Sequence, residues 1–130
     1  MKIPLHPVLV HFPIAFYFLE LVLLVFWIST RDGAYRRFAD FSFCVGYFFM
    51  LMSIMAGLSD VEGFSNIQGL TASHFYGAIG IFFIYTARGI YWRTASENQP
   101  AYAWIQVFGA LVGNGWVAYT SYLGGRLVYS

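Results

Sequence analysis

Charged residues are scarce in this chain, and their scarcity excludes several classes of protein. Only 10% of its 130 residues are Asp, Glu, Lys or Arg, whereas a typical soluble domain has about 25%. The formal net charge is +1, so the chain carries no basic patch large enough to displace many counterions from nucleic acid. We therefore expect no nucleic-acid partner.

Cysteine is almost absent as well. The one cysteine, Cys44, lies inside an apolar run and suits a small buried hydrophobic residue, since it cannot form an internal disulfide. The sequence also lacks CxxC, CxxCH and HExxH motifs, a phosphate-binding loop and a nucleophile elbow. Covalent c-type haem, nucleotide binding and hydrolase chemistry of these kinds are thereby excluded.

Long apolar segments, by contrast, fill most of the chain, which is 59% hydrophobic and 22% aromatic. Four of them, at about 8–28, 38–58, 71–91 and 101–123, reach the roughly 20 residues that a helix needs to cross a bilayer. Short connections make neighbouring helices antiparallel. The sequence therefore predicts an all-α membrane protein: one domain, residues 1–130, forming an up-down-up-down bundle of four transmembrane helices in contact with lipid. We identify no internal repeat.

Positive charge is unevenly divided between the two ends of this predicted bundle. Cytoplasmic loops of membrane proteins carry an excess of Lys and Arg. The two short loops with their flanks hold Arg31, Arg36, Arg37, Arg88 and Arg93, whereas the other end holds Lys2 and Arg126. The prediction is a bacterial inner (cytoplasmic) membrane protein with cytoplasmic short loops and both termini in the periplasm.

The three histidines all fall at the predicted outer end. His11 and His74 each have a small residue one turn deeper in the membrane, Ala15 and Gly77 respectively. Ionisable residues at membrane depth are rare and usually functional. We therefore interpret His11 and His74 as a pair of metal ligands, and His6, which precedes the predicted helix, as a supporting group.

A haem b held between two helices would use this arrangement. The iron takes axial imidazole nitrogens, and cofactor sites in helical bundles are built from facing helices. His11 and His74 would be the axial ligands, with His6 and Asp60 supporting them through hydrogen bonds to a ring nitrogen. Cationic or hydroxyl groups at the outer surface would meet the haem propionates; the candidates are Lys2, Arg126 and Tyr129.

Other interpretations of the same residues remain open. Histidines at helix ends also serve as polar anchors, and stripes of small residues also serve plain helix packing. A histidine could instead bind copper, zinc or a chlorophyll-type pigment. Glu20 lies about 13 Å deeper than His11 at 1.5 Å per residue, where a carboxylate should be paired, protonated or next to a polar cavity. Its candidate partners are Ser53, Asn114 and another subunit.

Three short motifs resemble a known family. The chain opens with His6-Pro7-x-x-Val10-His11-Phe12-Pro13, continues with Gly57-x-x-Asp60 and a histidine opening the third helix, and ends with Gly124-Gly125-x-Leu127-Val128-Tyr129. Together they resemble the predicted four-helix membrane proteins known as domain of unknown function 2231. Members of that family stand alone or are joined to Rieske-type or cytochrome c-like domains. The resemblance implies electron transfer at the outer side of the membrane.

Two functions fit these observations. The first is a b-type haem-binding electron-transfer subunit of a larger redox complex. It would pass electrons between the quinone pool, or a partner's centre such as a Rieske or cytochrome c protein, and an outside acceptor. The second is a cofactor-free accessory subunit of a membrane redox or photosynthetic complex. In neither case is the chain expected to be a stand-alone enzyme.

Overall fold

The computed structural model describes residues 5–61 and 67–129, and all regular structure within them is helical. The elements in chain order are α1 (Leu5–Leu9), α2 (His11–Thr30), α3 (Gly33–Asp60), α4 (Leu70–Thr94) and α5 (Tyr102–Tyr129). The predicted all-α class is confirmed. The first predicted helix corresponds to α1 and α2 together, and the other three are longer than predicted.

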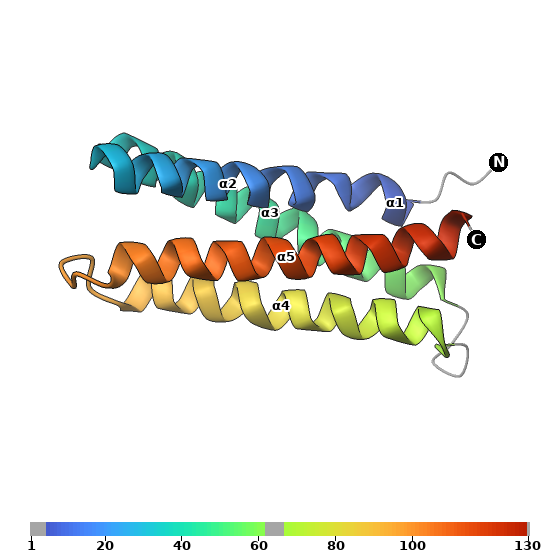
Figure 1. Cartoon of the computed structure of the whole chain (residues 1–130). Helices are drawn as coiled ribbons and strands as arrows, with labels where there is room; N and C mark the ends of the chain where they lie inside the picture. The colour runs from blue at the N-terminus through green and yellow to red at the C-terminus, as the bar shows by residue number, and fades with distance from the viewer. Residues whose placement is uncertain (1–4, 62–66, 130) are drawn as a thin grey trace.

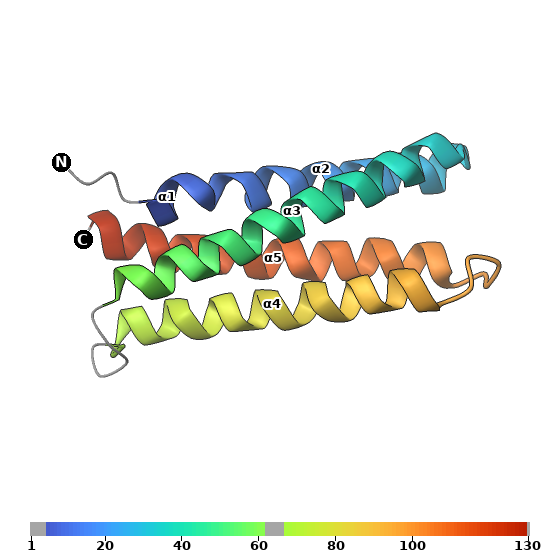
Figure 2. The same ribbon diagram turned by 180° about the vertical axis from the view of Figure 1, so that it is seen from behind.

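The four long helices lie side by side with alternating directions (Figure 1). α2 packs along α3, and α4 packs along α5, while α2 also contacts α5. Leu5 and Tyr129 lie at one end of the bundle, which we call the terminal end, and the α4–α5 connection lies at the other (Figures 1 and 2). A tight turn joins α2 to α3, because Asp32 caps α3 by accepting from the Ala34 N–H at 2.9 Å.

The first helix begins earlier than its apolar run suggests. Proline is tolerated in the first turn of a helix, so Pro7 does not prevent α1 from starting at Leu5. Pro13 cannot donate to the Leu9 carbonyl, and the regular helix is interrupted at Val10 between α1 and α2. As a result, His6 is part of a helix rather than of a segment that precedes it.

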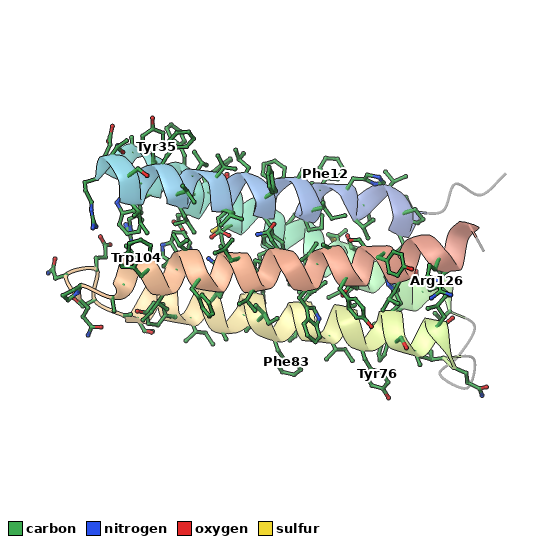
Figure 3. All side chains as sticks on the ribbon, in the orientation of Figure 1. Phe12, Tyr35, Tyr76, Phe83, Trp104 and Arg126 are labelled. Atoms are coloured by element: carbon green, nitrogen blue, oxygen red, sulfur yellow. The ribbon has the colours of Figure 1, made fainter. Side chains whose placement is uncertain are left out.

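The surface of the bundle is far more apolar than that of a soluble protein, and its largely hydrophobic core also contains polar side chains. Large apolar side chains such as Phe12, Tyr76 and Phe83 project outward (Figure 3), and Cys44, expected to be buried, is exposed on the same surface. The interior holds buried polar side chains: Glu20, Ser42, Ser53, Arg88, Gln106 and Thr120. In the described part of the chain, three helical segments are apolar and long enough to cross a membrane: Leu5–Thr30, Gly33–Asp60 and Leu70–Thr94.

The chain contains an internal repeat that inspection of the sequence missed. The same separation of 68 residues joins His6 to His74, Tyr17 to Tyr85 and Glu20 to Arg88. In α3 and α5 a separation of 67 residues joins the equivalent positions Gly46 and Gly113, Ser53 and Thr120, and Gly57 and Gly124. Few identical residues mark the repeat, so it becomes visible only through contacts.

Several contacts recur at equivalent positions in the two halves of the molecule. A Cβ on Gly46 would lie 2.8 Å from the Tyr17 ring, and a Cβ on Gly113 would lie 2.7 Å from the Tyr85 hydroxyl. The two tyrosine rings stack on each other at the centre, with centroids 3.6 Å apart and planes 10° apart. A residue that contacts its own counterpart lies near a two-fold axis. The bundle is therefore two similar helix pairs related by an approximate two-fold axis along its length.

Candidate functional site

The two imidazoles that face each other at the terminal end are those of His6 on α1 and His74 on α4. Their ring centroids lie 5.8 Å apart, and their planes are nearly perpendicular at 81°. Two nitrogens bound to one metal stand about 4 Å apart, because a metal–imidazole bond is about 2.0–2.1 Å. With the ring centroids 5.8 Å apart, two ring nitrogens that face each other are separated by a distance close to this value of about 4 Å. The pair can therefore share one metal atom.

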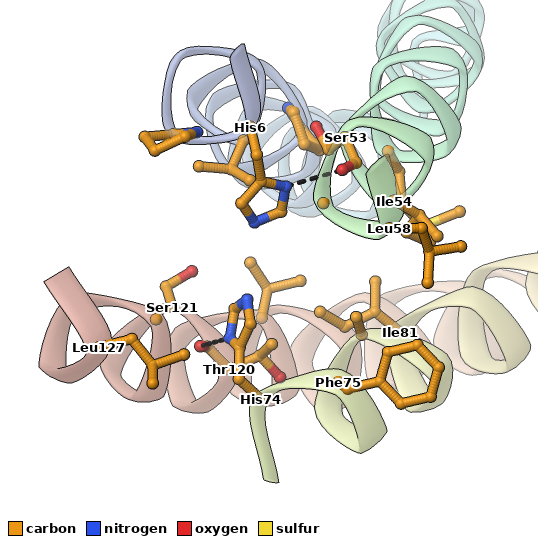
Figure 4. Close-up of a pocket in the computed structure, with 18 of the residues that line it drawn as sticks. His6, Ser53, Ile54, Leu58, His74, Phe75, Ile81, Thr120, Ser121 and Leu127 are labelled. Atoms are coloured by element: carbon orange, nitrogen blue, oxygen red, sulfur yellow. Dashed lines mark hydrogen bonds between the residues drawn. The ribbon is translucent and has the colours of Figure 1, made fainter. Parts of the chain in front are cut away.

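Backbone carbonyls fix the orientation of both rings. His6 Nδ1 lies 2.7 Å from the Ser53 carbonyl oxygen, and His74 Nδ1 lies 3.0 Å from that of Thr120. A carbonyl only accepts, so each Nδ1 donates, and in the neutral form of the ring Nε2 then has the lone pair that a metal needs. Figure 4 shows the second nitrogen of each ring pointing toward the opposite ring. This is the arrangement that holds metal-binding histidines in other proteins.

Glycines let both rings pack directly against a helix backbone. A Cβ on Gly57 would lie 3.0 Å from His6 Nδ1, and a Cβ on Gly124 would lie 2.8 Å from His74 Cε1. The rings border a cavity of about 500 Å³ whose wall is mainly apolar, with Ile54, Phe75 and Leu127 among its residues (Figure 4). Cofactor pockets commonly measure about 300–1,000 Å³ and combine an apolar wall with a few fixed polar groups.

This packing gives opposite expectations for two adjacent glycines. Gly124→Ala should destabilise the protein by about 1–3 kcal/mol, because the new methyl group displaces the His74 ring. Gly125→Ala has nothing within 4 Å of the new Cβ and should stabilise the helix by about 0.5–1 kcal/mol. Thermal unfolding in detergent measures both effects. Equal shifts of the two variants would contradict the packing described for His74.

The structure places all three histidines around one cavity, but the two imidazoles that face each other are those of His6 and His74. His74 faces His6, whereas the side chain of His11 is exposed and its Nδ1 lies 2.6 Å from the Pro7 carbonyl oxygen. The expected pairing of His11 with His74 is therefore not the observed one. His11 also lines the cavity, but one of its ring nitrogens is bonded to the Pro7 carbonyl within its own turn of helix.

The predicted supporting groups are distributed differently. Asp60 lines the cavity, but the partners of the two Nδ1 atoms are the carbonyls of Ser53 and Thr120 rather than its carboxylate. Arg126 is exposed on the last turns of α5 (Figure 3). Lys2 and the side chain of Tyr129 lie outside the described residues. Among the residues described, no group of three or more His, Cys, Asp or Glu side chains could hold a metal ion.

Glu20 has a partner that sequence reasoning missed. Arg88 donates from Nη1 to Glu20 Oε1 at 2.9 Å and from Nη2 to Oε2 at 2.6 Å, with the two side chains 8% and 0% exposed. The sequence pattern alone assigns Arg88 to the charges that flank a loop. The available signal was spacing: Glu20 and Arg88 each follow a histidine, His6 or His74, by 14 residues, which is almost four helical turns.

A family model matches almost the whole chain. The model for predicted membrane proteins known as domain of unknown function 2231 matches residues 2–130. The chain belongs to this family. No curated protein and no solved structure matches it. Membership in the family confirms the resemblance carried by the opening His-Pro motif, and it agrees with the apolar outer surface of the helices.

Proposed function

We propose that this member of the domain of unknown function 2231 family is a membrane-embedded, b-type haem-binding electron-transfer subunit whose axial ligands are His6 and His74. The observation that carries the proposal is the pair of facing imidazoles, each held through Nδ1 by a backbone carbonyl. A haem iron with two axial histidines supplies one-electron transfer. The porphyrin of a haem supplies four nitrogens to its iron, and two histidines would supply the remaining two ligands.

The residues around the pair fit such a group. Gly57 and Gly124 leave no side chain between each imidazole and the neighbouring helix, and the mainly apolar wall of the cavity would limit the access of water to a bound metal. The two halves of the molecule contribute equivalent ligands, so the metal would lie near the approximate two-fold axis. Arg126, next to cavity residues on α5, is the proposed cationic contact of a propionate.

We further propose that α5 also crosses the membrane, giving the four-span bundle. Its lower hydropathy is explained by polar residues that face the interior, since Gln106 and Thr120 are 1% and 4% exposed. Its outer face is apolar, with Trp104, Phe108 and Tyr122 each more than half exposed. A helix with apolar residues on its outer face and polar residues on its inner face can contact lipid on one side and the interior of the bundle on the other.

The proposed orientation in the inner membrane puts the terminal end, and hence the histidines, in the periplasmic half. Arg88 is buried and no longer counts, but Arg31, Arg36, Arg37 and Arg93 still favour a cytoplasmic α4–α5 connection. A periplasm-dependent alkaline phosphatase should be active when fused after residue 130 and inactive when fused within residues 96–99. The reverse pattern would contradict this orientation, and activity at both sites would contradict a spanning α5.

The experiment that tests the function is a reduced-minus-oxidised absorption spectrum of the protein purified from its host's membranes. A Soret peak and a sharp α-band are expected. A colourless protein that co-purifies with a larger complex would contradict the proposal and favour the accessory-subunit alternative. Pigment extraction and elemental analysis identify the other outcomes, a chlorophyll-type pigment or copper, either of which would also contradict it.

A further inference from the structure

A second hollow lies between α3 and α4, toward the α4–α5 connection. It has a volume of about 480 Å³, and its lining includes Phe43, Tyr47, Thr86, Gly89 and Arg93. The two helices diverge toward that end of the bundle (Figure 2), so the groove opens sideways onto the apolar surface. A molecule dissolved in the bilayer can enter it without crossing water.

The internal repeat shows that this groove is a departure from the symmetry of the bundle. Gly89 on α4 stands at the position that Leu21 occupies in the first half, 68 residues earlier, where a leucine packs against the core. Thr86 likewise stands at the position of Phe18. The first half has a leucine packed at the position of Gly89 and an outward-facing phenylalanine at the position of Thr86, whereas the second half has a glycine and a hydroxyl there.

The walls of the groove combine flat apolar surface with hydrogen-bond donors. Phe43 and Tyr47 stack with centroids 6.2 Å apart and planes 15° apart. The Tyr47 and Thr86 hydroxyls lie 2.9 Å apart; one proton joins them, and the other is available to an acceptor in the groove. Arg93 at the end of the groove donates to Asp40 at 2.8 Å, which offsets its charge. An uncharged ligand therefore suits the groove better than an anionic phospholipid headgroup.

We propose that this groove binds the headgroup of a membrane quinone. A quinone is a flat, uncharged ring with two carbonyl acceptors and an apolar tail, which matches an aromatic wall, a free hydroxyl proton and an opening to lipid. The inference rests on the proposed function, because it names a redox partner for the histidine pair. Tyr85 lines the groove, Tyr17 lines the histidine cavity, and their stacked rings separate the two.

The test measures how tightly a short-chain ubiquinone or menaquinone analogue binds to the purified full-length protein. Quenching of the protein's aromatic fluorescence reports the binding. Gly89→Leu, which restores the residue type found in the other half, should fill the groove and weaken binding by at least about tenfold. A Cβ at Gly89 would lie 3.4 Å from the Phe43 ring, an ordinary contact, so the variant should fold. Thr86→Val should weaken binding by about two- to tenfold through loss of one hydroxyl.

Gly115→Leu is the matched control, because it adds the same side chain on the exposed face of α5 with nothing within 4 Å. Its affinity for the quinone should equal that of the wild type. Undetectable binding to the wild type, unchanged binding in Gly89→Leu, or a phospholipid in the groove that the quinone fails to displace would overturn the proposal. The absorption spectrum is a separate test. A colourless protein whose quinone binding is still weakened by Gly89→Leu would contradict the proposed haem but support the proposed quinone site.

Discussion

Replacing Glu20 alone with Leu is expected to destabilise the protein by about 3–5 kcal/mol, because it leaves the Arg88 guanidinium buried without its counter-ion. Arg88→Leu alone should cost less, since an isolated carboxylate can take up a proton whereas a guanidinium stays charged. The double variant Glu20→Leu with Arg88→Leu should recover most of the loss, because apolar replacements of similar volume are often neutral. Thermal or denaturant unfolding in detergent micelles measures all three.

The exposed ion pair between Arg93 and Asp40 is the internal control. It has a comparable distance, 2.8 Å, but its side chains are 53% and 37% exposed. Surface pairs contribute about 0–1 kcal/mol, so Asp40→Asn should change stability little. If Glu20→Leu were as mild as Asp40→Asn, the buried pair would not hold the diagonally placed helices α2 and α4 together. A double variant no better than the worse single variant would contradict the role of charge.

The second large effect is expected at the histidine pair. His6→Ala and His74→Ala should each abolish the haem spectrum or convert it to that of a loosely bound, five-coordinate form, because each removes one axial ligand. His11→Ala should keep the wild-type spectrum, since its ring is exposed and bonded to its own turn of helix. Haem content per polypeptide, from a pyridine haemochrome assay, measures retention, and unfolding curves show whether each variant is folded.

Most of the fold could be predicted from the sequence because lipid imposes strong rules. Apolar segments of sufficient length gave four helices, and their short connections gave the alternating directions that the structure has. The boundary errors have a physical origin. Hydropathy marks where a helix is apolar, whereas the helix itself continues through polar residues, as α3 does to Asp60. At the start of the bundle's first helix, Pro7 is accommodated in α1, which begins before the apolar segment that the hydropathy marks.

The site was predicted less well, because it depends on the register of one helix relative to another. The first helix was predicted to begin three residues too late, so His6 was left outside it and was not paired with His74, which it faces in the structure. Arg88 was missed as the partner of Glu20 because a single-chain hydropathy profile carries no information about contacts between helices. A spacing of 68 residues separates His6 from His74 and also Glu20 from Arg88. This spacing is visible in the sequence and identifies Arg88 as the counterpart of Glu20.

The central claim is that His6 and His74 together hold one redox-active haem, and the most direct measurement is the reduced-minus-oxidised spectrum of three variants purified in parallel. The account predicts that His6→Ala and His74→Ala lose the wild-type Soret and α-band, while His11→Ala retains them. Loss in His11→Ala with retention in His6→Ala would contradict it, and so would a wild-type protein that binds no haem.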